Sequence, residues 1–222
     1  MKLVRNIPNL LIMTMIIVAL MLILRVWNNP KINVPQKSIG KQAFKTLVRS
    51  GDLLMTRSSN NMLSRLHSRF LGTPIAHVGI AIVFNEGKEN AQVYLFEGSA
   101  PRGAQLRSLD DYMNNGADCL WWSKLNTSDK LRKKITLVCE FFSESSYSWS
   151  FISDIPKLLL GLEVNVSEDN ETMANSCGDL VAQVYRTSGL LKTLKKNWMP
   201  LDFLKHIQFK NATIEKPINI IY

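Results

Sequence analysis

The segment 175–185 constrains the fold most, because its pattern indicates the start of a helix with a cysteine in the first turn. Ser176 can serve as the N-cap, and Asp179 three residues later can complete a capping box. Cys177 then lies among unpaired N–H groups at the positive end of the helix dipole, which favours its thiolate. An apolar stripe at helical spacing contains Cys177, Leu180, Val181 and Val184. We therefore expect a thiol at one end of a helix face that packs against a sheet.

A base for this thiol is found upstream, in the segment 76–84. Its alternation predicts a strand, with His77 and the small residues Gly79 and Ala81 on one face and branched residues on the other. Because small residues let a helix come close, we expect the Cys177 helix to pack on the His77 face. An imidazole beside a thiol can take its proton, and the thiolate can then attack a carbonyl.

A carboxylate follows on the next predicted strand. Residues 85–88 indicate a hairpin turn, so the segment 92–97 is expected to pair antiparallel with the His77 strand. Glu97 then lies across from the start of that strand, where it could orient the imidazole. On spacing alone, an exposed carboxylate at a strand end is the better explanation of Glu97, and only the family resemblance described next favours a catalytic role.

Four short segments carry a family resemblance. They are Ser-Gly-Asp-Leu-Leu-Met-Thr-Arg at 50–57, Ala-His-Val-Gly-Ile at 76–80, Phe-Glu-Gly at 96–98 and Ser-Cys-Gly-Asp-Leu-Val at 176–181. Together they resemble the circularly permuted papain-like hydrolases, the NlpC-related group that includes YiiX-like proteins, poxviral relatives and the lecithin:retinol acyltransferases. In that group the histidine strand precedes the cysteine helix, and the third polar residue follows on the next strand.

This resemblance covers residues 51–191 and implies an α+β fold in which an antiparallel sheet packs against the nucleophile helix. It also implies the catalytic roles: Cys177 as nucleophile, His77 as base and then acid, and Glu97 as the residue that orients His77. The loop at 98–103 lacks a GxSxG motif, so a serine hydrolase does not fit.

Residues 7–24 are apolar apart from Asn9 and Thr14. At about 1.5 Å per residue they span roughly 27 Å, enough for the core of a bilayer. A signal peptide is the alternative, but no small-x-small cleavage site follows. We expect residues 1–27 to form a single transmembrane anchor, 28–45 a linker and 46–222 the hydrolase domain. The balance of flanking charges and the need of a thiolate for a reducing compartment favour a cytoplasmic domain.

The chain carries a net charge of +9, with 27 lysines and arginines scattered along it. An anionic membrane surface explains this charge as well as nucleic acid does, and we expect no nucleic-acid partner because no binding motif is present. The three cysteines and three histidines lack metal-ligand spacing, and no phosphate-binding glycine motif occurs, so no metal or cofactor is expected. Cys119 and Cys139 are interpreted as small buried apolar residues.

Local patterns predict further helices at 41–49, 60–70, 107–112 and 128–142, and strands at 52–56 and 118–125. The apolar segment 147–161 fits core packing, a pocket wall or a membrane-facing flap. His67 is interpreted as a surface residue, and His206 as too isolated to act as the base.

The sequence thus predicts a membrane-anchored thiol hydrolase or acyltransferase that acts through an acyl-thioester on an amide or ester, lipid esters included. Two alternatives stay open: a catalytically silent membrane-anchored binding or structural protein of the same fold, and a basic nucleic-acid-binding membrane protein.

Overall fold

The computed structural model describes most of residues 37–221. The described ranges are 37–57, 73–99, 103–115, 119–143, 176–191, 200–204 and 212–221, with single positions at 13, 17, 198 and 209. The expected helix at 60–70 with His67, the segment 147–161 and His206 lie outside the described residues.

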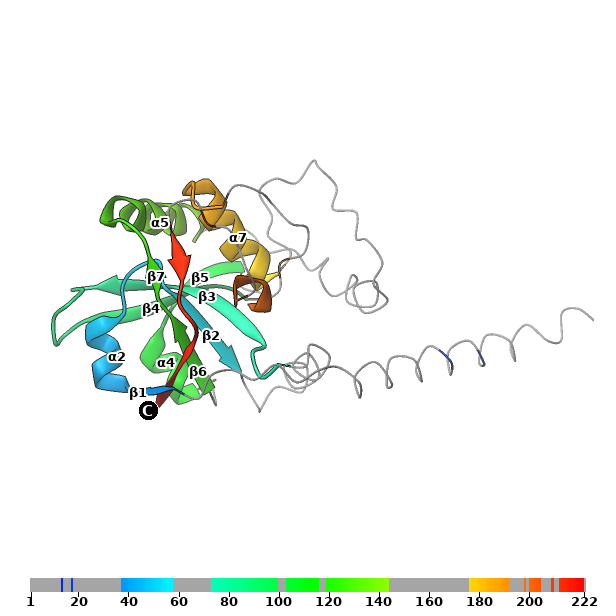
Figure 1. The fold of residues 1–222 in the computed structure, drawn as a ribbon, viewed down its shortest axis with the longest axis horizontal. Coiled ribbons are helices and arrows are strands. Elements are labelled where there is room, and N and C mark those ends of the chain that lie inside the picture. The colour runs from blue at the N-terminus through cyan, green and yellow to red at the C-terminus, as the bar shows by residue number, and fades with distance from the viewer. Residues whose placement is uncertain are drawn as a thin grey trace, which may run out of the picture.

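A large sheet of seven strands, in the order β1-β9-β6-β2-β3-β4-β5, forms the centre of the fold (Figure 1). The strands are β1 Ser38–Gly40, β2 Leu53–Arg57, β3 His77–Phe84, β4 Gln92–Ser99, β5 Gly103–Ser108, β6 Cys119–Ser123 and β9 Ile218–Ile221. All neighbours pair antiparallel except β1 with β9. A separate pair joins β7 Leu125–Asn126 to β8 Thr213–Ile214. The predicted hairpin between β3 and β4 is confirmed.

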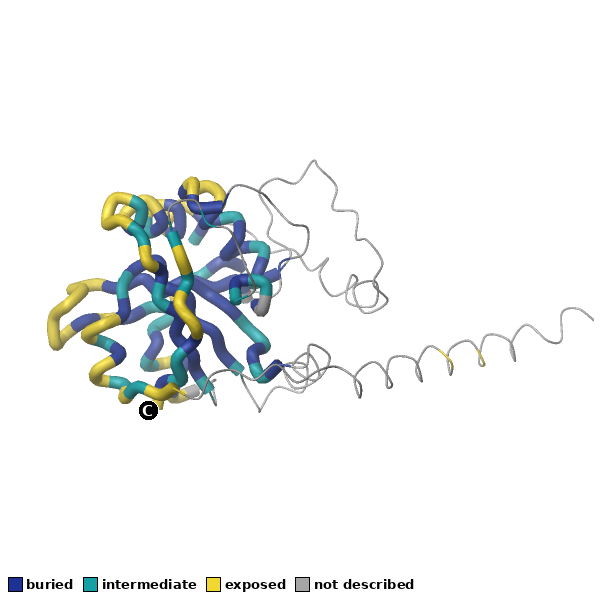
Figure 2. Tube along the Cα trace, in the orientation of Figure 1, coloured by how far each residue is buried: buried dark blue, intermediate teal, exposed yellow. Residues whose placement is uncertain are grey.

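Helices cover both faces of the sheet, so the predicted α+β class is confirmed. Figure 1 shows α5 Asp129–Phe142 and α7 Cys177–Thr187 on one side, and α2 Lys41–Leu47 and α4 Leu109–Asn115 on the other. A short 3-10 helix, η2, spans Pro200–Leu204. Two apolar cores result, one under α5 and α7 and one under α2 and α4, and buried residues run through the centre of the domain (Figure 2).

The face of β3 that receives the nucleophile helix differs from the prediction. Val78, Ile80 and Ile82 pack with Leu180, Val181 and Val184 of α7, whereas Ala81 and Val83 belong to the opposite core. The branched face buries more apolar surface against a helix than the small face could, which favours this arrangement. The expectation that α7 packs on the small face was therefore wrong.

The strands that were not predicted include β5 and β9 of the large sheet. β5 begins at the last residue of the expected loop 98–103, ends within the expected helix 107–112, and extends the sheet beyond β4. β9 comes from the last part of the chain and lies between β1 and β6. β1 and α2 also reach into the expected linker 28–45, and Phe44 is fully buried in the core under α2.

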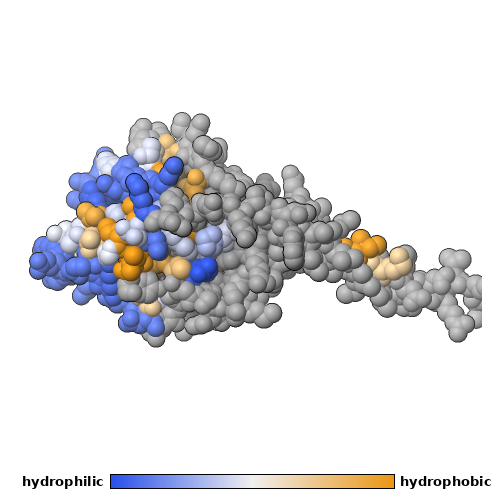
Figure 3. Space-filling model, turned by 60° about the horizontal axis from the view of Figure 1, so that its bottom comes forward, coloured by the Kyte–Doolittle hydropathy of each residue, from blue (hydrophilic) through white to orange (hydrophobic). Residues whose placement is uncertain are grey.

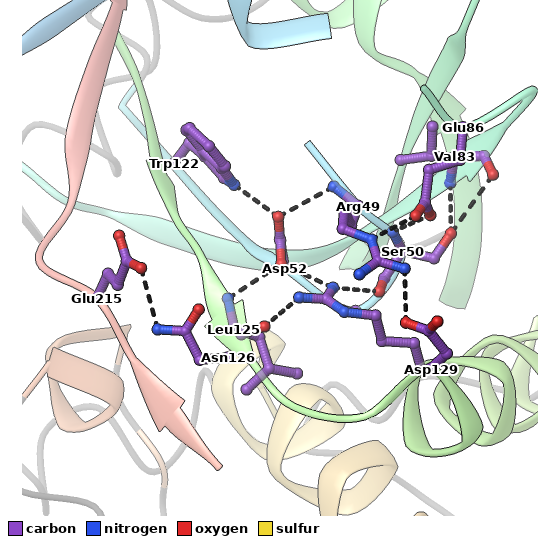
Figure 4. A network of polar contacts seen from close by, with 12 residues as sticks. Arg49, Ser50, Asp52, Val83, Glu86, Trp122, Leu125, Asn126, Asp129 and Glu215 are labelled. Atoms are coloured by element: carbon purple, nitrogen blue, oxygen red, sulfur yellow. Dashed lines mark hydrogen bonds and ion pairs between the residues drawn. The ribbon is translucent and has the colours of Figure 1, made fainter. Parts of the chain in front are cut away.

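A buried network around Asp52 joins the sheet to α5 (Figure 4). One carboxylate oxygen accepts from the Leu125 N–H and from Arg132, and the other accepts from the Arg49 N–H and the Trp122 indole. Arg132 also donates to the carbonyls of Ser50 and Leu125. Because both charges are buried, these many hydrogen bonds are what offsets their desolvation.

No helix within the described part of the chain is long and apolar enough to cross a membrane. The expected anchor at 1–27 lies outside the described residues except for Met13 and Ile17, which are helical.

On the face drawn in Figure 3, apolar residues lie among a largely hydrophilic surface. Among the described residues, Leu47 of α2 and Ile221 of β9 are exposed large apolar residues.

Candidate active site

The N-terminus of α7 is fixed by its cap and by a distant backbone segment. Ser176 is extended, with φ −149° and ψ 165°, and its hydroxyl oxygen accepts from the Asp179 N–H at 3.1 Å. The Asp179 carboxylate accepts from the Ser176 hydroxyl at 2.8 Å and from the Trp198 N–H at 2.7 Å. Burial raises the pKa of Asp179, although these two donors lower it. The predicted Ser176 cap is confirmed, and Cys177 is the first residue of the helix.

The pairing of β3 with β4 ends close to the N-terminus of α7. The β3–β4 pairing runs from Phe84 to Ile80, so residues 77–79 of β3 have pairing partners only in β2. The Val78 N–H is therefore available to the Cys177 sulfur, to which it donates a hydrogen bond. His77 lies at the end of β3 that does not pair with β4. Although the small face of the strand looks toward α4, its imidazole forms a hydrogen bond with Cys177 in the first turn of α7.

Gly79 permits the approach of β3 and β4 beside this end of β3. A Cβ at this position would lie 2.5 Å from the Phe96 carbonyl oxygen and 2.5 Å from Leu95 Cδ1. Because the carbonyl belongs to the β4 backbone and cannot turn away, this small residue serves the strand–strand contact rather than a helix.

Glu97 holds the imidazole from one side. His77 Nε2 lies 2.7 Å from Glu97 Oε2, and Gln105 of β5 donates to the other carboxylate oxygen at 3.2 Å. The Glu97 side chain is only 4% exposed, whereas that of His77 is 22% exposed. With Nε2 occupied, Nδ1 is the ring nitrogen left for the thiol. Sequence reasoning missed Gln105, because its strand was not predicted.

The Cys177 thiol and the His77 imidazole stabilise each other's charged forms. Burial raises the pKa of Cys177, but the His77 charge, a hydrogen bond with His77 and the Val78 N–H outweigh it and hold the pKa below its ordinary value. Burial lowers the pKa of His77, yet the Cys177 charge, the nearby Tyr112 and hydrogen bonds to Cys177 and Glu97 raise it well above its ordinary value. Both shifts act in the direction that favours a thiolate beside an imidazolium.

Tyr112 of α4 approaches this pair from the opposite side of the sheet. Its hydroxyl group and the Thr56 hydroxyl lie 2.8 Å apart, and Thr56 pairs with His77 across the β2–β3 ladder. Sequence reasoning also missed this residue. Ser108-Leu109-Asp110-Asp111 indicated a helix start there, but nothing in the local pattern showed which face of the sheet that helix would cover.

The other two cysteines differ from Cys177. Cys139 is buried within α5, and burial, followed by the Glu140 charge, raises its pKa well above its ordinary value. Cys119 is half-buried at the start of β6 and accepts a hydrogen bond from Arg57. Within the described ranges, no group of three or more His, Cys, Asp or Glu side chains is arranged to hold a metal ion.

Comparison with known proteins shows a distant structural similarity. No family model matches the chain, and no curated protein matches it by sequence. Among solved structures, the metalloprotein YiiX from Escherichia coli O157:H7 is similar at 14% identity and a TM-score of 0.49, covering 78% of this chain and 96% of that one. The geometry described above comes from this chain's own residues.

Proposed function

We propose that this protein is a cysteine-dependent acyl hydrolase or acyltransferase of the permuted papain-like type, with Cys177 as nucleophile, His77 as acid–base and Glu97 as the residue that orients His77. One observation carries the proposal: the imidazole lies between the thiol and a buried carboxylate, 2.7 Å from the latter. A nucleophile, a base and a group that holds the base are the parts that such catalysis requires.

The chemistry follows from these positions. The Cys177 thiolate attacks the carbonyl carbon of an amide or ester, and the carbonyl electron pair moves to oxygen. The backbone N–H of Cys177, in the first helical turn without an intrahelical acceptor, supports the oxyanion. As the C–N or C–O bond breaks, the His77 imidazolium gives its proton to the leaving group, and an acyl-thioester remains.

The second half-reaction releases the acyl group. Neutral His77 takes a proton from water, an alcohol or an amine, which attacks the thioester carbonyl, and the Cys177 thiolate leaves. Water gives hydrolysis and the other acceptors give acyl transfer. Throughout, Glu97 keeps the ring in one orientation and favours its charged form.

Intact-mass analysis after treatment with iodoacetamide tests this proposal. The parent should gain one fast adduct at neutral pH, mapped to Cys177 by peptide analysis, and Cys177→Ala should lose it. Cys119→Ala is the matched control, because it removes a half-buried thiol outside the His77 contact, and it should keep the fast adduct. Labelling of Cys177 no faster than labelling of Cys119 would contradict the proposal.

We further propose that residues 1–27 hold the domain at the cytoplasmic side of a membrane, which makes a lipid or lipid-linked substrate suitable. The apolar run at 7–24 supports this. Removing residues 1–27 leaves β1 and α2 intact, so the shortened protein should fold and leave the membrane fraction. Its retention in the membrane pellet after a high-salt wash would show that another part of the chain binds lipid.

A further inference from the structure

Arg57 lies at the same end of the sheet as the Cys177–His77 pair. It is the last residue of β2, directly after Thr56, which pairs with His77. Alternation along β2 puts it on the face of Leu53 and Met55, which belong to the core under α7. Its partner across the ladder, Cys119, also packs against that core. Arg57 therefore projects on the side of the sheet that carries the nucleophile helix.

Arg57 lies close enough to the Cys177 thiol for a single substrate molecule to contact both residues. Met55 pairs with Val78, whose N–H donates to the Cys177 sulfur. Two residues along the strand and one strand across place the Cα of Arg57 about 8 Å from that of Val78. A fully extended arginine side chain is nearly as long as this distance. In this structure the guanidinium turns toward Cys119 of β6, on the other side of β2, so contact with a substrate at Cys177 requires the side chain to turn toward β3.

Among the described residues, the guanidinium has no acceptor that matches its charge. Its Nε is buried without a hydrogen-bond partner, and Nη2 donates to the Cys119 sulfur at 3.5 Å. A thiol is a weak, uncharged acceptor. Within the described ranges Arg57 makes no ion pair, whereas Arg49, Arg107 and Arg132 each pair with a carboxylate. A partly desolvated cation without an anion is energetically unfavourable, so a bound anion would stabilise the Arg57 guanidinium.

We propose that Arg57 forms an anion-binding subsite of the active site, and that the acyl substrate carries a carboxylate or phosphate group close to the scissile bond. The planar fork of a guanidinium binds either group through two parallel hydrogen bonds. An anion bound beside Cys177 would give the guanidinium a stronger acceptor than the Cys119 thiol and would align the carbonyl with Cys177. This inference rests on the proposed function and adds the charge of the substrate to it.

Two alkylating reagents of nearly equal size test the subsite without a known substrate. Iodoacetate carries a carboxylate, and iodoacetamide is its neutral counterpart; the readout is the ratio of their rates at Cys177. Arg57→Gln should lower the iodoacetate-to-iodoacetamide ratio roughly fivefold, and rising salt should lower the ratio in the parent but hardly in the variant. Arg57→Lys should keep part of the preference, because the charge remains but the fork is lost.

Arg186→Gln is the matched control, since Arg186 is exposed near the C-terminus of α7 and its replacement removes the same charge. Its ratio should equal that of the parent. Protection of Cys177 by propionate or by inorganic phosphate, in the parent and not in Arg57→Gln, identifies a carboxylate or a phosphate as the preferred group.

The outcomes separate the two proposals. A fast iodoacetamide reaction with a ratio that Arg57→Gln leaves unchanged overturns the subsite and leaves the nucleophile in place. Slow reaction of Cys177 with both reagents overturns the proposed function itself.

Discussion

Replacing Gly79 by alanine should damage the site without touching any of its chemical groups. The added Cβ would lie 2.5 Å from the Phe96 carbonyl oxygen and from Leu95 Cδ1, while ordinary contacts begin at about 3.4 Å. The Leu95 methyl group can rotate, but the carbonyl belongs to the β4 backbone and moves only with its strand. β3 and β4 must therefore separate by several tenths of an ångström, next to His77 on one strand and Glu97 on the other.

The cost can be approximated from this contact. Overpacking of a rigid site typically destabilises by about 1–3 kcal/mol. The lower backbone entropy of unfolded alanine relative to glycine returns about 0.4–1 kcal/mol. We expect Gly79→Ala to lower the free energy of unfolding by roughly 1–2 kcal/mol, which in urea moves the midpoint by about 0.5–1 M. Because the His77–Glu97 contact spans the same two strands, alkylation of Cys177 at neutral pH should also slow.

Gly40→Ala is the control. Gly40 has a φ of −70°, and a Cβ there meets nothing within 4 Å, so its urea midpoint and its alkylation rate should stay near those of the parent. If Gly79→Ala unfolds at the same urea concentration as Gly40→Ala and alkylates at the parent rate, then the close approach of β3 and β4 does not position the imidazole.

Three further predictions concern the charged groups. With any ester or amide substrate, Cys177→Ala should abolish turnover, His77→Ala should lose about 10²–10⁴-fold, and Glu97→Gln should lose less; full activity in Glu97→Gln would remove that residue from the site. The alkylation rate of Cys177 should rise with pH around a midpoint below that of an ordinary cysteine, and His77→Ala should move the midpoint upward, because the imidazolium lowers the pKa of Cys177. An unchanged midpoint would contradict the ion pair. Arg132→Met should destabilise by about 3–5 kcal/mol in urea unfolding, since it leaves the buried Asp52 charge without its partner, and a loss below 1 kcal/mol would show that water compensates the charge.

The His77–Cys177 pair makes the free energy of unfolding depend on pH. The pKa of His77 is raised in the fold, so its contribution is complete below the pKa of an unfolded histidine and is lost as pH rises through the raised value. The pKa of Cys177 is lowered, so its contribution is present above the pKa of an unfolded cysteine and is lost as pH falls through the lowered value.

The helix cap and the hairpin at the site were predictable from the sequence. The face of β3 on which α7 packs was not. The Ser176 cap and the hairpin that brings Glu97 toward His77 depend on neighbours within a few residues, and both formed as expected. The side of β3 covered by α7 depends on packing partners far along the chain. Gly79 and Ala81 suggested room for a helix, but the Phe96 carbonyl and Leu95 take up the space at Gly79.

Site residues whose side chains are not typical catalytic groups could not be identified from the sequence either. Gln105 contacts Glu97 only because β5 pairs with β4, and polar alternation in that short segment did not distinguish a strand from a loop. Arg57 ends one of the segments that resemble the hydrolase family. That no anionic group among the described residues contacts it becomes apparent only when the neighbours of its guanidinium are known.

The position of β9 has a consequence for how the chain folds during synthesis. β9 lies between β1 and β6, so residues 38–40 cannot join the sheet until residues 218–221 have left the ribosome. Until then, β6 is an open edge that includes Trp121 and Trp122, and pairing over so long a stretch of chain is slow. A nascent chain of this protein therefore exposes an aromatic strand edge from the emergence of residues 119–123 until that of residues 218–221, which makes chaperone capture or misassociation with a second nascent chain most favourable at that edge.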